Sequence, residues 1–172
     1  MHKIIFLDRD GTINKDDGYT NKVGDYKLLP NTIKGLKKLQ SQKFKLIIVT
    51  NQSGIGRGYY TEDQMHEFNN HLLNKLKQEN IDIKEVLFCP HTPEDNCNCR
   101  KPKTKLIESY FTPDFDKNNS YVIGDRASDI ELANNAGIKS VLVTTGSSEN
   151  DPESNSNPTF IAEDLLDAAN KI

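Results

Sequence analysis

Short apolar runs alternate with longer, mostly polar segments along this chain, and the alternation predicts its secondary structure. The apolar runs at residues 4–7, 44–49, 86–88, 120–123 and 139–143 are continuous, as in strands of a parallel sheet with both faces covered. Between and after them, apolar positions at helical spacing predict five helices. One begins at 30–31, one runs from 61 to about 79, one covers 105–111, one ends at Gly137 and one covers about 162–169. Because strands and helices alternate, we expect an α/β fold in three layers, with helices on both faces of a parallel sheet.

Two polar segments interrupt this pattern. Residues 14–29 follow the first strand directly and form either a flap over a site there or a solvated connection. Residues 147–158 are rich in Ser, Asn, Asp, Glu and Pro, so we expect a mobile loop. The chain shows no internal repeat and no linker, and 172 residues suffice for one full core, so we expect a single domain over residues 1–172.

Composition narrows the possible partners. Charged residues are 27% of the chain, hydrophobic residues 35%, the net charge is -3 and the pI is near 5.8. Nothing therefore indicates nucleic acid or an anionic membrane as the main partner. No apolar stretch reaches the length that spans a bilayer, and residues 1–3 lead straight into the first strand. We expect a cytoplasmic protein without a signal peptide.

The first strand ends in two carboxylates, Asp8 and Asp10, which Gly11 and Thr12 follow. In an extended chain, residues two apart point to the same side, and ligands of open α/β sheets bind beyond the carboxyl ends of the strands. Such a pair can bind a hard divalent cation, or divide the work between a nucleophile and a general acid/base. The alternative is that Asp8 caps a helix and Asp10 begins a turn.

Other strands end in a similar way. The strand at 44–49 leads into Thr50 and Asn51 and then a glycine-rich loop over residues 52–58, whose neutral donors suit oxyanions, although such a loop can also be a flexible turn. The strand at 120–123 leads into Asp125. Asp129 follows at a spacing that lets it cap the next helix. Alternatively, it could orient the ligands of a metal ion without binding the ion itself.

All three cysteines of the chain lie within eleven positions, at Cys89, Cys97 and Cys99, and His91 lies among them. Three thiols and one imidazole are the four ligands of a closed, tetrahedral zinc site. We call residues 89–99 the Cys/His loop and expect it to bind a structural zinc ion. An odd number of cysteines in so short a window argues against a disulfide framework. The alternative is three unrelated free cysteines and a turn histidine.

Together these residues predict a magnesium-dependent phosphoryl-transfer site at the carboxyl ends of the strands. Asp8 would be the nucleophile and form an aspartyl-phosphate, while Asp10 would protonate the leaving oxygen and then activate water. Thr50, Asn51 and Lys101 would stabilise the phosphoryl oxygens. Mg²⁺ would be held by three residues: Asp8, Asp125 and the backbone carbonyl of Asp10.

The sequence resembles the haloacid dehalogenase superfamily in four segments, in order: 8–12, 50–51, 101–102 and 124–129. The resemblance narrows to the branch that contains D-glycero-D-manno-heptose 1,7-bisphosphate 7-phosphatases and histidinol-phosphate phosphatases. It implies a Rossmann-like fold without a large cap domain. We expect a monomer that acts on a small phosphorylated metabolite. The resemblance also implies substrate contacts from Asp16, Asp17, Gly18, Tyr19, Asn51, Gln52, Ser53, Arg100 and Arg126.

The two members of this branch differ in substrate. The glycine-rich loop and residues 17–19 resemble the heptose bisphosphatase, which we favour because loops beside the nucleophile contact the substrate. The five residues between His91 and Cys97, and residues 124–129, resemble the histidinol phosphatase instead. A phosphotransferase or mutase that uses the same intermediate is a further alternative. A non-catalytic zinc-binding module is more remote, because it would lack a nucleophile, acid or metal ligand.

Overall fold

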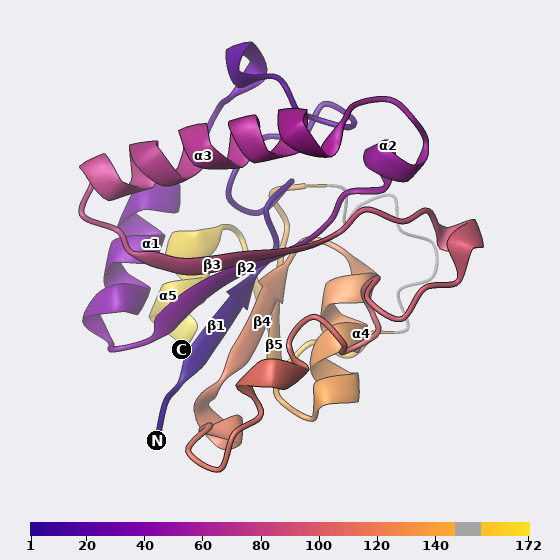
Figure 1. Ribbon diagram of the computed structural model, residues 1–172. Coiled ribbons are helices and arrows are strands. Elements are labelled where there is room, and N and C mark those ends of the chain that lie inside the picture. The colour runs from indigo at the N-terminus through magenta and orange to yellow at the C-terminus, as the bar shows by residue number, and fades with distance from the viewer. Residues whose placement is uncertain (147–155) are drawn as a thin grey trace.

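The computed structural model describes residues 1–146 and 156–172. In this part of the chain, six parallel strands form one sheet in the order β3-β2-β1-β4-β5-β6 (Figure 1). The strands are β1 (Ile4–Leu7), β2 (Lys45–Asn51), β3 (Ile83–Cys89), β4 (Tyr121–Gly124), β5 (Lys139–Val143) and β6 (Phe160–Ala162). Since all strands run the same way, their carboxyl ends lie along one edge of the sheet, with those of β1 and its neighbours at the centre.

Helices cover both faces of this sheet. The helices are α1 (Thr32–Ser41), α2 (Ser53–Gly56), α3 (Glu62–Gln78), α4 (Ala127–Ala136) and α5 (Leu165–Lys171). Short 3-10 turns lie at Val23–Asp25, Pro93–Asp95, Glu108–Tyr110 and Lys117–Asn119. Side chains of α1, α3 and α5 pack in one core cluster and those of α4 in the other, so the three-layer α/β prediction is confirmed. No helix within the described ranges is both long and apolar enough to cross a membrane.

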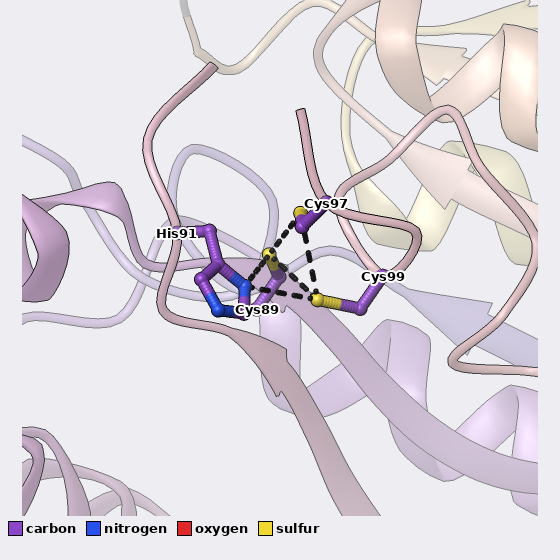
Figure 2. A group of neighbouring side chains, drawn as sticks. All are labelled: Cys89, His91, Cys97 and Cys99. Carbon is purple, nitrogen blue, oxygen red and sulfur yellow. Dashed lines mark hydrogen bonds between the residues drawn. The ribbon is translucent and has the colours of Figure 1, made fainter. Parts of the chain in front are cut away.

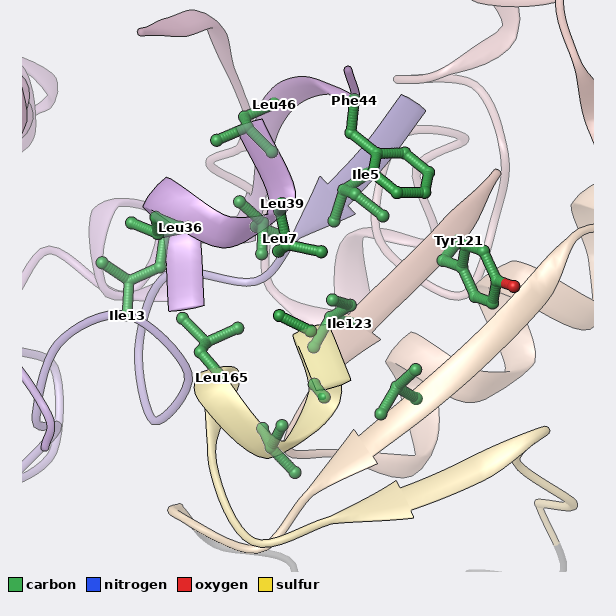
Figure 3. Close-up of a cluster of buried hydrophobic side chains, with 14 of the residues drawn as sticks. Ile5, Leu7, Ile13, Leu36, Leu39, Phe44, Leu46, Tyr121, Ile123 and Leu165 are labelled. Carbon is green, nitrogen blue, oxygen red and sulfur yellow. The ribbon is translucent and has the colours of Figure 1, made fainter. Parts of the chain in front are cut away.

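The central strand β1 divides the core between the two faces. Ile5 and Leu7 belong to the same cluster as Leu36 of α1 and Leu165 of α5 (Figure 3). Ile4 and Phe6 belong to the cluster on the α4 side, as the alternation of a strand requires. All four β1 side chains are at most 2% exposed, and burying each contributes about 1.5–3 kcal/mol. The strand that carries the acidic pair is therefore firmly anchored.

Helix ends follow local sequence signals. Thr61 Oγ1 accepts a hydrogen bond from the Gln64 N–H at 3.2 Å, and the Thr61 N–H donates to Gln64 Oε1 at 2.9 Å, which forms a capping box. Gly137 ends α4 in the left-handed conformation at φ 65°. These two boundaries agree with the sequence pattern.

One predicted helix is absent and another starts later than predicted. Residues 105–111 do not form an α-helix but only the 3-10 turn Glu108–Tyr110, because so short a segment makes too few hydrogen bonds to offset nucleation. The last helix starts at Leu165, with Asp164 as its cap, and not near residue 162. Residues 160–162 instead form β6, which is too short to be recognised from its pattern. The predicted loop at 147–158 falls, up to residue 155, outside the described residues.

Candidate active site

A cavity of about 330 Å³ lies at the carboxyl ends of β1 and β2, beside the segments that follow β3 and β4. Most of the side chains that the sequence predicts for a phosphoryl-transfer site line it. The lining residues are Asp8, Asp10, Asp16, Gly18, Tyr19, Thr50, Asn51, Gln52, Ser53, Arg57, Tyr60, Arg100, Lys101, Arg126, Ser128 and Asp129. Residues up to 121 positions apart in the sequence thus meet at this edge of the sheet.

Lys101 joins two buried carboxylates at the floor of the cavity. Its Nζ donates hydrogen bonds to Asp8 Oδ1 at 2.7 Å, Asp129 Oδ1 at 2.6 Å and the backbone oxygen of Val49 at 2.7 Å. Burial alone would lower the pKa of Lys101, but Asp129 and Asp8 more than offset it and raise that pKa. The ammonium therefore stays charged beside Asp8.

Asp8 lies in an environment that is short of positive charge. Burial raises the pKa of its carboxyl, Lys101 lowers it, and the carboxylates of Asp129, Asp125 and Asp10 raise it further. Carboxylate oxygens of Asp8, Asp125 and Asp129 all lie within 4.8 Å of one another. Three carboxylates whose oxygens lie this close together supply ligands that fit a hard divalent cation such as Mg²⁺.

Two glycines make room for the Asp125 carboxylate. A Cβ on Gly11 would lie 2.5 Å from Asp125 Oδ2, and one on Gly146 would lie 2.0 Å from the same oxygen. Gly11 also has φ +84°, a conformation that other residues rarely adopt. Thr145 Oγ1 donates to the Gly11 carbonyl at 2.7 Å and fixes this contact between the ends of β1 and β5. Gly11 lay within a recognisable motif, whereas nothing in the sequence marked Gly146.

Two functions were predicted for Asp129, and the structure shows the first of them, capping of helix α4. Its Oδ2 accepts a hydrogen bond from the Arg126 N–H at 3.2 Å at the start of α4, while its Oδ1 accepts from Lys101. One side chain thus caps α4 and orients the lysine. Its position within the group of three carboxylates also matches the other alternative, support of a metal.

Asp10 is held by four donated hydrogen bonds. Arg9 donates from Nε to Oδ1 at 3.0 Å and from Nη2 to Oδ2 at 2.8 Å, which is a bidentate ion pair. Asn14 Nδ2 donates to Oδ1 at 2.9 Å and Gln52 Nε2 donates to Oδ2 at 2.8 Å. The carboxylate of Asp10 is therefore fixed in the cavity wall, close to the end of β1.

The end of β2 holds the segment that carries Lys101. The Lys101 N–H donates to Asn51 Oδ1 at 3.0 Å, and Asn51 Nδ2 donates to the Lys101 carbonyl at 3.3 Å. Gln52 Nε2 also donates to Thr50 Oγ1 at 2.8 Å. The Asn51 and Gln52 side chains, predicted to bind substrate, are thus largely engaged with protein groups and shape the cavity.

The 14–29 segment lies against the cavity, as its interpretation as a flap requires. Asp16 Oδ1 accepts from the Gly18 N–H at 3.0 Å and from Thr20 Oγ1 at 3.0 Å, and Asp16 Oδ2 lies 3.8 Å from Arg126 Nη2.

Asp17 is different from its neighbours. It does not line this cavity but pairs with Lys15 at 2.6 Å with a largely exposed side chain, so its predicted substrate contact has no support in the structure.

The sequence analysis missed several residues that line the cavity. Arg57 follows α2, and its Nη2 lies 3.8 Å from Glu94 Oε2 of the Cys/His loop. Tyr60 donates from its hydroxyl to Gln52 Oε1 at 2.6 Å. A basic residue in a glycine-rich loop after a strand is a signal that could have identified Arg57. Ser128 had no such signal.

The four residues predicted to bind zinc converge (Figure 2). Their Sγ–Sγ distances are 3.1 Å for Cys89–Cys99, 3.5 Å for Cys89–Cys97 and 3.6 Å for Cys97–Cys99, and His91 Nδ1 lies 3.2 Å from Cys99 Sγ. A tetrahedron with Zn–S bonds of 2.3 Å has S–S edges of about 3.8 Å, so the cluster has nearly the right size. The three cysteines are free thiols in the described part of the chain.

The Cys/His loop is joined to the cavity on two sides. The Gln52 N–H donates to the Cys89 carbonyl at 2.8 Å, and the Gly56 N–H donates to the Pro90 carbonyl at 2.9 Å. Arg100 and Lys101 follow the last cysteine directly and line the cavity. The Cys/His loop is therefore continuous with the segment that carries two cations of the site.

Comparison with known proteins agrees with this geometry. A family model described as HAD-hydrolase-like matches residues 98–168. A probable D-glycero-D-manno-heptose-1,7-bisphosphate 7-phosphatase of Thermoplasma volcanium is 49% identical over 128 residues, which are 72% of this chain and 86% of that protein. The D-glycero-alpha-D-manno-heptose-1,7-bisphosphate 7-phosphatase of Photorhabdus laumondii is 38% identical over 96% of this chain and 97% of that protein.

Two further comparisons bear on fold and substrate. The crystal structure of D,D-heptose 1,7-bisphosphate phosphatase from B. bronchiseptica, complexed with magnesium and phosphate, has a TM-score of 0.88 at 28% identity and covers 99% of this chain and 97% of its own. The histidine biosynthesis bifunctional protein HisB of Legionella pneumophila is 44% identical over 80% of this chain, but over only 40% of HisB. The Photorhabdus laumondii relative and the B. bronchiseptica structure match nearly the whole chain, and the acids and the lysine of this chain line one cavity. This chain therefore belongs to the haloacid dehalogenase-like hydrolases and is a phosphatase.

Proposed function

We propose that this phosphatase removes the 7-phosphate of D-glycero-D-manno-heptose 1,7-bisphosphate through an aspartyl-phosphate on Asp8. The observation that carries the mechanism is the position of Lys101, whose ammonium lies 2.7 Å from Asp8 Oδ1 at the floor of a polar cavity. A fixed cation beside a buried carboxylate can hold a phosphoryl group against the nucleophile and stabilise the charge that develops on its oxygens.

The chain's own residues account for both chemical steps. An Asp8 oxygen attacks phosphorus, the bond from phosphorus to the sugar oxygen breaks, and Asp10 gives that oxygen a proton. Asp10 then takes a proton from water, which attacks phosphorus and releases the Asp8 carboxylate and inorganic phosphate. The Thr50 hydroxyl and the Lys101 ammonium contact the phosphoryl oxygens in both steps.

Two metal ions belong to this proposal. Asp8, Asp125 and the backbone carbonyl of Asp10 would hold Mg²⁺, which supplies charge neutralisation for the phosphate, and the room that Gly11 leaves for Asp125 supports this assignment. Cys89, His91, Cys97 and Cys99 would hold a structural Zn²⁺. A zinc site with three thiolates is consistent with the reducing cytoplasm, where we place the enzyme.

The charge of the outer cavity favours a bisphosphate as substrate. Arg57, Arg100 and Arg126 all line the cavity, in addition to Lys101 at its floor. Although burial alone would lower the pKa of Arg126, nearby carboxylates, Asp125 first, more than offset it and raise that pKa. Three guanidinium groups suit a second phosphate at the far end of the substrate, and Arg is well adapted to phosphate.

Histidinol phosphate is the second candidate, supported by the HisB match and the short spacing of the Cys/His loop. It carries a single phosphate and a cationic amino group, which three arginines would repel. Asp16 is the acidic side chain in the lining that could face such an amine, but it already accepts hydrogen bonds from the 14–29 segment and lies near Arg126.

A side-by-side assay of phosphate release tests the proposal. With Mg²⁺ present and no acceptor metabolite, we expect kcat/KM to be higher for heptose 1,7-bisphosphate than for histidinol phosphate. The opposite order assigns the second substrate, and release that depends on an added acceptor identifies a phosphotransferase. Activity on neither substrate contradicts the proposal.

Two variants test the mechanism in the same assay. Asp8→Asn keeps the shape of the side chain but removes the nucleophile, so turnover should be abolished while the circular dichroism spectrum is unchanged. Asp63→Asn, on the exposed first turn of α3, is the matched control and should retain full activity. Undiminished phosphate release by Asp8→Asn would rule out the aspartyl-phosphate.

A further inference from the structure

Arg9, between the two aspartates of β1, is completely buried. It is the largest side chain with no exposed surface in the described chain, and its Cζ lies 4.7 Å from the centre of the Phe68 ring on α3. Moving a guanidinium out of water costs several kcal/mol unless strong partners compensate. So costly a placement at the edge of the site calls for a function that a buried apolar residue could not perform.

The partners of Arg9 come from four separate segments. Besides the bidentate pair with Asp10, Nη1 donates to Asn69 Oδ1 at 2.8 Å, and Nη2 donates to the Thr20 carbonyl at 2.9 Å and to Gln52 Oε1 at 3.2 Å. Through Nη2, one guanidinium thus contacts both Asp10 and the 14–29 segment, which lines the cavity.

Gln52 and Tyr60 complete this network. The Gln52 amide donates to Asp10 and to Thr50 and accepts from Arg9 and from the Tyr60 hydroxyl, so both ends of the amide are satisfied. Burial raises the pKa of Tyr60 to about 12, so its hydroxyl remains a donor. The orientation of Gln52, and with it the Oδ2 side of Asp10, is therefore determined by fixed partners.

We propose that Arg9, supported by Gln52 and Tyr60, is a positioning residue that holds the Asp10 carboxylate in the wall of the cavity, where one of its oxygens gives up a protein donor in order to exchange a proton with the leaving oxygen or with water. The inference rests on the proposed function, in which Asp10 is the general acid/base. The bidentate fork fixes both the place and the plane of the carboxylate, which a single point charge cannot do. The shared Nη2 also ties this orientation to the backbone of the 14–29 segment.

A double-mutant cycle between Arg9 and Asp10 tests the proposal. Arg9→Lys keeps the buried charge but loses the fork, and we expect kcat to fall about ten- to a hundredfold, with KM changed by less than about twofold. In an Asp10→Asn background the same substitution should leave kcat unchanged, because the group through which Arg9 acts is already gone. Both measurements use the better of the two substrates assayed above, with Mg²⁺.

A second double-mutant cycle uses a milder substitution, in case Arg9→Lys prevents folding. Tyr60→Phe removes one hydroxyl and one hydrogen bond to Gln52, and it should lower kcat a fewfold in the native background but not in the Asp10→Asn background. If either substitution lowers kcat by the same factor in both backgrounds, or raises KM with kcat unchanged, Arg9 and Tyr60 only support the fold and the proposal is wrong. A wild-type kcat for Asp10→Asn alone would instead overturn the role of Asp10 in the proposed function.

Discussion

At the scale of single residues, the site depends on how charge is shared between buried groups. Lys101 is the cation that contacts both Asp8 and Asp129 within hydrogen-bond distance, and all three side chains are nearly inaccessible to water. Removing one partner of a buried ion pair leaves the other charge without compensation, which costs more than the pair itself contributes. Lys101 should therefore matter to stability as much as to catalysis.

The substitution Lys101→Met tests this expectation. We expect the free energy of unfolding to fall by about 3–5 kcal/mol and phosphate release to become undetectable, because Asp8 and Asp129 lose their shared cation. Denaturant unfolding without added metal measures the first effect. Lys105→Met is the control and should change stability by less than about 0.5 kcal/mol, because the Lys105 side chain is 67% exposed and its ion pair with Glu108, at 3.4 Å, lies at the surface. Equal stability of the two variants would contradict the argument.

At the scale of elements, the position of the site depends on how helices and loops are held against the sheet. The two helices α1 and α5 cross so closely that a Cβ on Gly35 would lie 2.5 Å from the Leu165 carbonyl carbon and 2.6 Å from its oxygen. Backbone atoms cannot move aside as the end of a side chain can. The close crossing seals the face on which Ile5 and Leu7 of β1 are buried.

Gly35→Ala should therefore destabilise the protein, although alanine favours helices more than glycine does. We expect a loss of about 1–3 kcal/mol, because overpacking forces α1 and α5 apart. Gly24→Ala is the matched control, since no atom of the described residues lies within 4 Å of a Cβ placed there, and it should be nearly neutral. Thermal unfolding of both variants measures the difference. A Gly35→Ala protein as stable as wild type would show that the helices separate at little cost.

The Cys/His loop is a second element whose state should control the site. We expect freshly purified protein to contain zinc, and its removal by a thiol-preferring chelator to raise KM before the whole protein unfolds, because Arg100 and Lys101 lose their anchor. Cys99→Ser should act in the same direction, whereas Asn98→Ala, between two of the ligands, should not. Metal analysis and steady-state kinetics measure both effects. Absence of zinc, with activity insensitive to the chelator, would contradict this role.

At the scale of the whole molecule, the site is built at a cost to stability. Burial and neighbouring carboxylates raise the pKa of Asp8, so the folded protein holds that proton more tightly than the unfolded chain does. The stability contributed by the protonated form is complete below the ordinary pKa of an aspartate, about 3.9, and is lost as the pH rises toward the folded pKa. At neutral pH, above the ordinary pKa of an aspartate, this contribution is reduced, so Asp8 costs the metal-free fold stability that a neutral side chain of the same shape would not.

Asp8→Asn should accordingly be inactive yet more stable than wild type. We expect its Tm in metal-free buffer to exceed the wild-type Tm at pH 7, and the difference to shrink as the pH falls toward 4, since the neutral amide does not titrate. Thermal unfolding at several pH values measures the difference. A lower Tm for Asp8→Asn at pH 7 would mean that the attraction of Lys101 outweighs the cost of burial.

The sequence alone predicted the features that depend on neighbours in the chain. Apolar runs identified β1, β2, β4 and β5, because strands covered on both faces must be apolar throughout, and the spacing of Thr61 and Gln64 marked the start of α3. The Cys/His cluster and the acids at the strand ends were also predicted, since their ligand types and positions are local properties. The strand β6 and the turn at residues 108–110 were not, because segments so short take their structure from the elements they pack against.

Only the tertiary structure decided which side chains act on one another. That Lys101 contacts Asp8 and Asp129, that Gly146 leaves room for Asp125, and that the Asn51 side chain pairs with the Lys101 backbone follow from packing between segments far apart in the chain. Arg9 is the clearest case. Its type and position gave no sign that it would be buried, because the partners that make burial possible, Asn69 and the Thr20 carbonyl among them, meet it only once the chain has folded.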